Sequence, residues 1–231
     1  MPSSSDFLVY YGHAPEALER LCGSELVIFE SRGWKPEQLR RLKESEAQLY
    51  AYLSPFAWPD WMGAVKWWWG SKERDPIWNA WWLKPSSRGW RYQLKKMCGD
   101  LAPRFDGLFL DNLDRLEQDP KSLQPFLRFL EKLRQQWPQM KLIGNRGFSH
   151  WSSLNKKFDG VLFENLTDRA FTSKDRAWVE EKLYSLQSTK IYALDYQTRR
   201  VEQEAQRLRK LFPRLRYYCA PDESLQSLSS D

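Results

Sequence analysis

The sequence predicts a (β/α)8 barrel, and the spacing and character of its apolar runs lead to this fold class. Eight short apolar runs alternate with segments of helical periodicity along the 231 residues. The runs are nearly continuous in apolarity, which is typical of strands buried on both faces of a parallel sheet. Eight strand–helix units in a chain of about this length favour a closed barrel over an open doubly wound sheet. We therefore expect a single domain spanning residues 1–231.

The expected strands are rich in Val, Ile, Leu, Phe and Tyr, the residues that strands prefer. They are Phe7–Gly12, Leu26–Ser31, Gln48–Ser54, Gly107–Asp111, Lys141–Asn145, Gly160–Glu164, Lys190–Asp195 and Leu215–Ala220. No Gly-x-Gly-x-x-Gly sequence follows the first of them, so a dinucleotide-binding fold has little support.

The expected helices lie between the strands, and several begin at Pro, Ser or Asp, which are common at helix starts. They are Pro15–Leu21, Pro36–Glu44, Gly89–Leu101, Ser122–Trp137, His150–Phe158, Ser173–Leu186 and Arg199–Leu211. A short tail from Asp222 could form an eighth helix.

Two stretches of the chain resemble each other closely. Arg104–Leu113 aligns without a gap with Lys157–Leu166, and both run from Phe-Asp-Gly to a carboxylate followed by Asn-Leu. The two carboxylates are Asp111, at the end of the fourth expected strand, and Glu164, at the end of the sixth. A charge at the end of a buried strand costs free energy unless something compensates for it. The repeat therefore indicates a pair of catalytic carboxylates.

The barrel fold predicts where these two acids lie. Active sites of (β/α)8 barrels lie at the C-terminal ends of the strands, and alternate strands contribute side chains to the same interior layer. We therefore expect Asp111 and Glu164 to face each other at this rim. The alternative is a pair of structural carboxylates bonded to loop amides. For Asp106 and Asp159, in the turns before the two strands, we expect a structural role.

Polar residues also end other expected strands. The candidate substrate-binding residues among them are Tyr11, Glu30, Asn145, Asp195 and Tyr196. Asp195 could contact substrate or could pair with Arg146. Asn145 and Tyr196 could contact substrate or support residues that do.

The connection after the third expected strand is long and rich in tryptophan. Nine of the chain's 13 tryptophans lie between Trp58 and Trp90. Long loops at the catalytic face of a barrel shape the substrate site, and aromatic planes suit the apolar faces of sugar rings. We expect most of these rings to pack the loop against the barrel and two or three to face substrate, with Trp58 and Trp82 as candidates.

The composition excludes several other kinds of protein. Two histidines and three widely spaced cysteines supply no metal-ligand set, and no Walker loop or Gly-x-Ser-x-Gly sequence occurs. The net charge of +6 is dispersed rather than gathered in a basic stripe, so we expect no specific nucleic-acid binding. No apolar window is long enough to span a membrane. No signal peptide is visible, which predicts a cytoplasmic protein, or a secreted one if a leader has been removed.

Two carboxylates on opposed strands beside an aromatic loop fit glycoside hydrolysis best, because one can donate a proton while the other attacks or activates water. A specific family resemblance agrees with this. Phe105-Asp-Gly-Leu-Phe-Leu-Asp-Asn-Leu-Asp114 resembles the signature of glycoside hydrolase family 114, the endo-α-1,4-polygalactosaminidase-like barrels. Similar segments are Tyr10-Tyr-Gly12, Ala51-Tyr-Leu-Ser54, Ile143-Gly-Asn-Arg-Gly147, Gly160-Val-Leu-Phe-Glu-Asn-Leu166 and Ala193-Leu-Asp-Tyr196.

The resemblance implies an endo-acting enzyme that cleaves α-linked polysaccharide containing galactosamine, with no metal or organic cofactor. It also implies that Asp111 is the nucleophile and Glu164 the general acid/base of a retaining reaction. The residues themselves do not fix which acid does which. We expect a monomer whose partner is an oligosaccharide or polysaccharide. The main alternative is a barrel that binds glycan without catalysis, and a nucleic-acid-binding protein is a third hypothesis.

Overall fold

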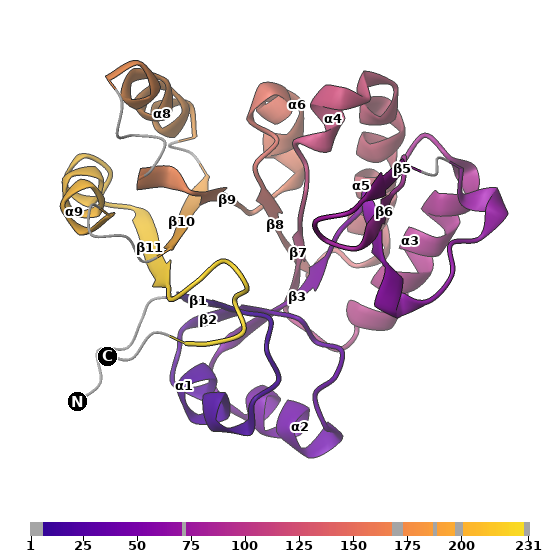
Figure 1. Cartoon of the computed structure of the whole chain (residues 1–231), viewed down its shortest axis with the longest axis horizontal. Helices are drawn as coiled ribbons and strands as arrows, with labels where there is room; N and C mark the ends of the chain where they lie inside the picture. The colour runs from indigo at the N-terminus through magenta and orange to yellow at the C-terminus, as the bar shows by residue number, and fades with distance from the viewer. Residues whose placement is uncertain (1–6, 71–72, 168–172, 187–188, 197–200, 229–231) are drawn as a thin grey trace. The chain divides into compact units, whose positions relative to one another are not determined.

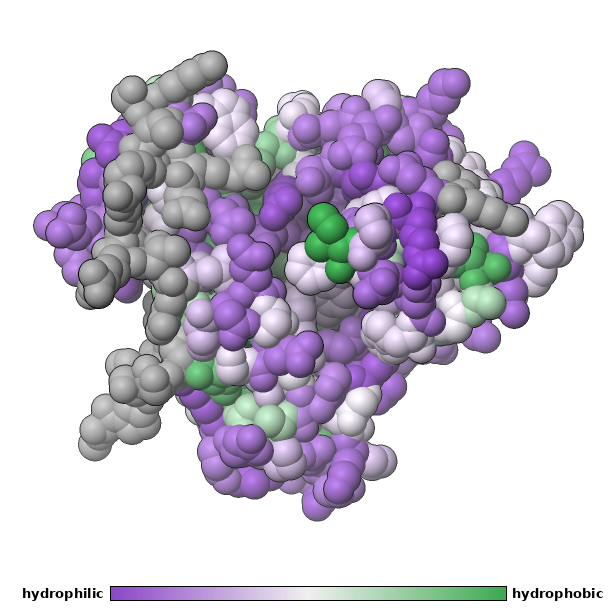
Figure 2. Space-filling view, in the orientation of Figure 1, coloured by the Kyte–Doolittle hydropathy of each residue, from purple (hydrophilic) through white to green (hydrophobic). Residues whose placement is uncertain are grey.

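The structure is a computed structural model, and it describes residues 7–70, 73–167, 173–186, 189–196 and 201–228 (Figure 1). Contacts between Cα atoms divide the chain into two compact units. Unit 1 comprises Met1–Tyr52 and Gly160–Asp231, and unit 2 comprises Leu53–Asp159. No helix in the described part of the chain is long and apolar enough to cross a membrane. Hydrophilic residues cover most of the face drawn in Figure 2.

Unit 1 holds most of the parallel strands. They are β1 (Phe7–Tyr10), β2 (Leu26–Phe29), β3 (Gln48–Leu53, whose last residue belongs to unit 2), β9 (Gly160–Glu164), β10 (Lys190–Tyr196) and β11 (Leu215–Ala220). β2 pairs with β1 and β3, and β10 pairs with β9 and β11, always in parallel. The ring of Phe7 in β1 contacts Tyr192 of β10 and Tyr218 of β11 edge-on, at centroid distances of 5.1 and 6.1 Å. The first strand of the chain therefore lies beside the last.

The helices of unit 1 lie outside its strands (Figure 1). They are η1 (Pro15–Ala17), α1 (Leu18–Cys22), α2 (Pro36–Glu44), α8 (Ser173–Ser185) and α9 (Val201–Leu211). Helix α2 shows why the sequence forms them. Pro36 opens its first turn, and Leu39 and Leu42, three residues apart, are buried on one face.

Unit 2 contains strands β7 (Gly107–Leu110) and β8 (Lys141–Asn145), which pair in parallel. Its helical segments are α3 (Arg88–Leu101), α4 (Arg115–Gln118), η4 (Pro120–Ser122), α5 (Leu123–Gln136), η5 (Phe148–His150), α6 (Trp151–Leu154) and η6 (Asn155–Lys157). Helix α5 buries an apolar face of helical spacing, formed by Phe126, Phe129, Leu130 and Leu133.

The long connection of unit 2 folds into a small sheet of its own. Its strands β4 (Ala57–Pro59), β6 (Ala80–Trp82) and β5 (Glu73–Asp75) pair antiparallel in that order. The short turns η2 (Asp60–Met62) and η3 (Trp67–Trp69) complete the connection. The sequence predicted the length and tryptophan content of this segment but not its sheet.

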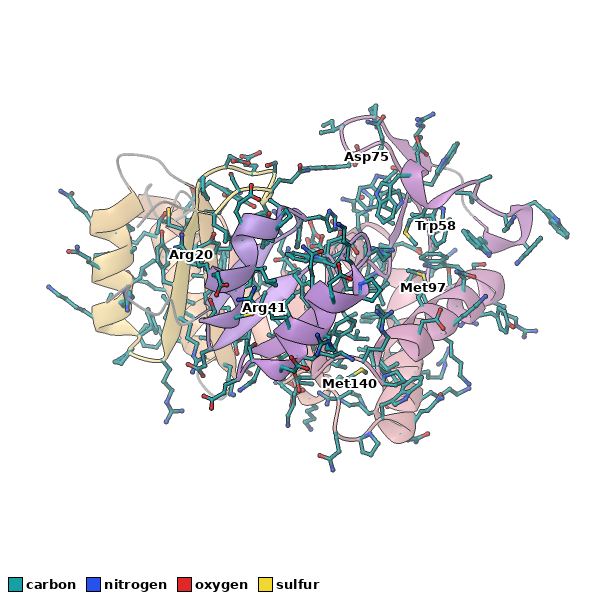
Figure 3. All side chains as sticks on the ribbon, turned by 90° about the horizontal axis from the view of Figure 1, so that it is seen from below. Arg20, Arg41, Trp58, Asp75, Met97 and Met140 are labelled. Carbon is teal, nitrogen blue, oxygen red and sulfur yellow. The ribbon has the colours of Figure 1, made fainter. Side chains whose placement is uncertain are left out.

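Three tryptophans join the small sheet to helix α3, and we call them the tryptophan cluster. The ring of Trp58 lies 4.7 Å from Trp69 and 6.1 Å from Trp90, measured between centroids. All three rings are buried. Figure 3 shows Trp58 between the small sheet, which carries Asp75, and α3, which carries Met97. The Trp90 indole N–H also donates to the carbonyl of Pro55 at 2.7 Å. The cluster therefore forms a satellite core for this connection.

The turn before β9 has the structural role that the sequence predicted for Asp159. Its carboxylate accepts a hydrogen bond from Arg134 Nη2 at 2.6 Å and another from the Leu142 backbone N–H at 2.8 Å. It thereby fastens α5 and β8 to the segment that leads into β9.

The order of the main strands, β1-β2-β3-β7-β8-β9-β10-β11, is their order in the chain. Parallel strands in sequential order, of which all but the last, β11, are followed by helical segments, form the predicted (β/α)8 barrel fold. Expected strand ends differ from the observed ones by two residues at most. Two helix expectations were wrong. Residues 150–158 contain only the four-residue α6 between two 3-10 turns, and residues 222–228 form turns instead of an eighth helix.

Candidate active site

The chain turns sharply after three neighbouring strands, β7, β8 and β9. The residues at these turns are Asn112, Arg146 and Asn165, with φ angles of 61°, 63° and 55°. This left-handed conformation costs free energy for residues other than glycine, and Asn tolerates it best. The polar residues directly before the turns are Asp111, Asn145 and Glu164. The Asn in each copy of the repeat therefore turns the chain away just after the acid.

In unit 2, Asp111 lies at the centre of a hydrogen-bonded group that we call the Asp111 cluster: Ser54, Asp111, Asn112 and Asn145. Asp111 Oδ1 accepts from Asn145 Nδ2 and from the Asn112 backbone N–H, both at 2.7 Å. Its Oδ2 accepts from Asn112 Nδ2 at 3.2 Å. N–H donors of this kind stabilise an ionised carboxylate. The donors thus fix the orientation of the half-buried Asp111 carboxylate.

Strand β3 supports the Asp111 cluster from one side. The Asp111 backbone N–H donates to the carbonyl of Leu53 at 3.0 Å, and Asn112 Nδ2 donates to Ser54 Oγ at 3.0 Å. Neither Asn112 nor Ser54 is among the site residues predicted from the sequence. The available signal was that Ser54 directly follows the last apolar residue of β3, as Asp111 does in β7.

Arg146, which the sequence offered as a possible partner of Asp195, forms an ion pair with Asp114 in unit 2. Its Nη1 atom lies 3.6 Å from Asp114 Oδ2, and both side chains are partly exposed. The ion pair therefore joins the turn after β8 to the turn after β7.

In unit 1, Glu164 ends β9 and is also half-buried. Its Oε1 accepts a hydrogen bond from the Tyr196 hydroxyl at 2.7 Å. Strand pairing explains this contact, because Glu164 lies opposite Leu194 in β10, two residues before Tyr196. Glu164 therefore has a hydroxyl donor where Asp111 has amide donors.

Asp195 lies in β10 beside Tyr196 but is almost fully buried, with 1% of its surface exposed. Its two carboxylate oxygens accept from the Thr167 backbone N–H at 3.1 and 3.3 Å. One residue earlier in β10, the Leu194 carbonyl accepts from the Asn165 N–H at 2.8 Å. Asp195 thus fastens the segment that follows Glu164 to strand β10.

Tyr217 of β11 also lies close to Asp195. Burial, followed by the negative charge of Asp195, raises the pKa of the Tyr217 hydroxyl well above its usual range. The hydroxyl therefore stays protonated at physiological pH and can donate. The sequence analysis did not single out Tyr217, because its relation to Asp195 depends on the register of β10 and β11.

Two further predicted residues, Tyr11 and Glu30, also lie in unit 1. The ring of Tyr11 lies 4.8 Å from that of Tyr52, measured between centroids. Glu30 is buried and forms a bidentate ion pair with Arg32. The Nε–Oε1 and Nη2–Oε2 distances are 2.7 and 2.6 Å. Its charge is thereby compensated within its own turn.

The two predicted tryptophans, Trp58 and Trp82, differ in their surroundings. Trp58 is buried in the tryptophan cluster, and its indole N–H donates to the Gly63 carbonyl at 2.7 Å. Trp82 is half-buried, and the guanidinium of Arg115 lies 3.9 Å from its ring centroid. Other tryptophans of the connection are largely exposed, namely Trp61, Trp67, Trp68 and Trp78. The connection thus has both packed and solvent-facing rings.

The described residues contain no group of three or more His, Cys, Asp or Glu side chains that could hold a metal ion. Two carboxylates are available for chemistry: Asp111, oriented by amide N–H groups, and Glu164, which accepts a hydrogen bond from the Tyr196 hydroxyl. They lie in different units, at the ends of equivalent strands.

Comparison with known proteins gives a family match over most of the chain. Residues 26–220 match the model of glycoside-hydrolase family GH114. The search of curated proteins found no match.

Solved structures give a second comparison. The glycoside hydrolase domain of PelA from Pseudomonas aeruginosa is 25% identical, with a TM-score of 0.81 over 99% of this chain and 98% of that one. A variant of that domain, at 26% identity, gives the same TM-score and coverage. Aspergillus fumigatus Ega3, in complex with galactosamine, is 13% identical, with a TM-score of 0.62 over 84% of this chain and 77% of that one. At that identity the likeness to Ega3 concerns the fold.

Proposed function

Because the chain belongs to glycoside-hydrolase family GH114, we propose that it cleaves α-linked polysaccharide containing galactosamine, with Asp111 and Glu164 as its carboxylate pair. The observation that carries this proposal is the contrast between the two acids. They end equivalent strands of the fold, yet Asp111 accepts hydrogen bonds from amide N–H groups and Glu164 accepts one from a tyrosine hydroxyl. Glycosidases need two carboxyl groups in different states, one charged and one able to give a proton.

Asp111 is the nucleophile in this proposal. The N–H groups of Asn112 and Asn145 keep its carboxylate charged and aimed, which a nucleophile requires. Its oxygen attacks the anomeric carbon as the glycosidic bond breaks, so a covalent glycosyl–enzyme intermediate forms.

Glu164 is the general acid and base. In the first step it gives its proton to the departing glycosidic oxygen. In the second step it takes a proton from water, whose oxygen attacks the anomeric carbon and releases Asp111. The Tyr196 hydroxyl, 2.7 Å from Glu164 Oε1, orients the carboxyl group throughout. The configuration at the anomeric carbon is retained.

The substrate class rests on the relatives. The family match, the near full-length likeness to a PelA glycoside hydrolase domain and the galactosamine complex of Ega3 support a polymer of this amino sugar. An endo-acting mode fits a polymeric substrate. The exposed tryptophans of the long connection offer ring faces to sugar units at a distance from the cleaved bond.

The test uses the intact chain and partly deacetylated α-1,4-linked galactosaminoglycan, with new reducing ends as the readout. We expect turnover by the unaltered protein. We expect Asp111→Asn and Glu164→Gln each to lower kcat/KM by roughly 10²–10⁴-fold, the usual contribution of such groups. Product sizes at early times distinguish endo from exo cleavage, and the anomeric NMR signal of fresh product distinguishes retention from inversion.

Asp106→Asn is a suitable control, because Asp106 lies in the turn before β7, at the opposite end of the strand from Asp111. It should leave turnover within a few-fold of the unaltered protein. Full activity in both Asp111→Asn and Glu164→Gln would exclude the pair. Tight binding of oligosaccharide with no turnover by the unaltered protein would instead favour a glycan-binding barrel.

A further inference from the structure

Helices α3 and α5 of unit 2 lie side by side on the outside of the strands (Figure 1). A groove of about 310 Å³ lies between them. We call it the α3–α5 groove. Its charged lining residues are all cationic: Arg88, Arg91, Lys95, Arg128 and Lys132. None of these residues belongs to the candidate active site.

The cations of the α3–α5 groove have little local compensation from acidic side chains. No ion pair among the described residues includes Arg88, Lys95, Arg128 or Lys132. The acid nearest to them on α5 is Glu131, which pairs instead with Lys157 at 2.9 Å. Asp100 of α3 does not line the groove. The four cationic side chains are exposed. Lys157 is the main cause that lowers the pKa of Glu131, and the charge of Arg128 adds less, so the four cations share at most part of one acid.

Arg91 shows how closely these charges are gathered. Its guanidinium donates to the carbonyls of Pro85 and Ser86, which hold it at the start of α3. Partial burial, followed by the positive charges of Arg128 and Arg88, lowers the pKa of Arg91. The repulsion comes from both helices, so the two rows of cations lie close together across the groove.

The position of the cations on α3 is also unfavourable for the helix itself. The first turn of α3 contains Arg88 and Arg91 and no acidic residue. Helix N-termini carry a partial positive charge, so cations in the first turn are unfavourable for the helix. A bound anion would offset both this cost and the repulsion between the rows.

The floor of the α3–α5 groove is apolar. Phe129 and Leu133 of α5 form part of it and are largely buried. Trp137 closes one end, with its ring against Gly99 of α3, where an added Cβ would lie 3.7 Å from the indole. Tyr92, with 72% of its surface exposed, stands on the rim. The groove therefore combines cationic edges with an apolar base.

We propose that the α3–α5 groove is a docking site for an acidic, amphipathic polypeptide segment. Arg88, Arg91 and Lys95 recur every three or four residues on one face of α3 and span roughly 10 Å. A partner helix with acidic residues at the same spacing can place one carboxylate opposite each of these cations. The apolar face of that helix can then pack against the apolar floor of the groove. A galactosamine polymer carries positive charge and is repelled here, so this site is separate from the proposed substrate site.

Other anionic ligands fit less well. Single-stranded nucleic acid needs a series of exposed rings on which successive bases stack, and the groove exposes only Tyr92 to this extent. Pockets for small molecules enclose most of the ligand surface. Here four of the five cations are themselves exposed, so the groove is open along its length.

The test measures fluorescence anisotropy of a labelled peptide of about 14 residues, with Glu on one helical face and Leu on the other, against the intact chain. We expect saturable binding that weakens as salt rises. The double variant Arg128→Glu/Lys132→Glu should raise Kd at least about 10-fold, because two attractive contacts become repulsive. Lys96→Glu/Lys121→Glu is the matched control with the same change of net charge, since both lysines are exposed outside the groove, and it should change Kd less than about 3-fold.

Three results would overturn the proposal. One is no binding up to about 1 mM peptide. The second is equal loss of affinity in the groove variant and in Lys96→Glu/Lys121→Glu, which would indicate net charge alone. The third is tighter binding of an oligothymidine of equal charge than of the peptide. Circular dichroism of each variant establishes that the fold is kept. The outcome therefore does not depend on whether the protein has glycosidase activity.

Discussion

At the scale of single residues, the two acids of the repeat differ in their hydrogen-bond donors. Asp111 receives N–H groups from Asn112 and Asn145, and Glu164 receives the hydroxyl of Tyr196. A hydrogen bond to a charged partner contributes about 1.5–3 kcal/mol, so these neighbours matter for a reaction in which carboxyl charge changes.

We expect Tyr196→Phe to lower kcat/KM by roughly 10-fold or more, because it removes the donor to Glu164 and keeps the ring. Initial rates of reducing-end formation measure the effect. Tyr184→Phe is the control, because Tyr184 is half exposed on α8 and packs against Phe212 through its ring. Equal rates for Tyr196→Phe and the unaltered protein would show that this hydrogen bond has no part in turnover.

The sequence singles out the two acids and offers Asn145 and Tyr196 as possible supports, but it does not show which acid each of them bonds. Asp111 and Glu164 stand out because carboxylates follow apolar runs at equivalent positions of a repeat. The bond from Tyr196 to Glu164 depends on the register that places Glu164 opposite Leu194, and residue order alone does not give a register. Ser54 was missed for the same reason.

At the scale of secondary-structure elements, the left-handed residues after β7, β8 and β9 position the strand ends. Their φ angles place Asn112, Arg146 and Asn165 in a region that β-branched residues avoid. In both copies of the repeat, the Asn of Asn-Leu thus marks a left-handed turn, directly after the acid that is the candidate catalytic residue.

We expect Asn165→Val to destabilise the protein by about 1–3 kcal/mol, because Val cannot adopt the φ of 55° without strain. Asn165→Gly removes the same side chain but tolerates this φ, so it should cost less than about 1 kcal/mol. Urea unfolding of the two variants measures the difference. Equal losses would mean that the Asn165 side chain, and not its backbone conformation, stabilises the turn.

The small sheet of unit 2 shows where pattern reading failed. Its strands have only three residues each, β4 ends in Pro59, and bulky Trp side chains obscure any alternation of polar and apolar positions. Period-two alternation needs about four to eight residues to be recognised. The eight longer strands could be recognised without alternation, because each is a nearly continuous apolar run of at least four residues, so the barrel was predictable and the sheet was not.

At the scale of the whole molecule, the proposal that residues 1–231 form one domain can be tested. Among the described residues of unit 2, only β7 and β8 are paired parallel strands, and sheets of two strands are marginally stable at best. We therefore expect neither unit to unfold independently of the other.

Two core substitutions, one in each unit, test this expectation. Phe7 contacts strands β10 and β11 in unit 1, Trp90 belongs to the tryptophan cluster in unit 2, and both side chains are fully buried. Phe7→Ala and Trp90→Ala should each cost about 3–5 kcal/mol. In one cooperative domain of this size, each lowers the single calorimetric transition by roughly 6–20 °C. The calorimetric and van't Hoff enthalpies should stay equal.

A second transition in Trp90→Ala, with the first unmoved, would instead mean that unit 2 unfolds by itself. Trp67→Ala, which removes a ring with 79% of its surface exposed, should leave the midpoint within about 2 °C, because little buried area is lost.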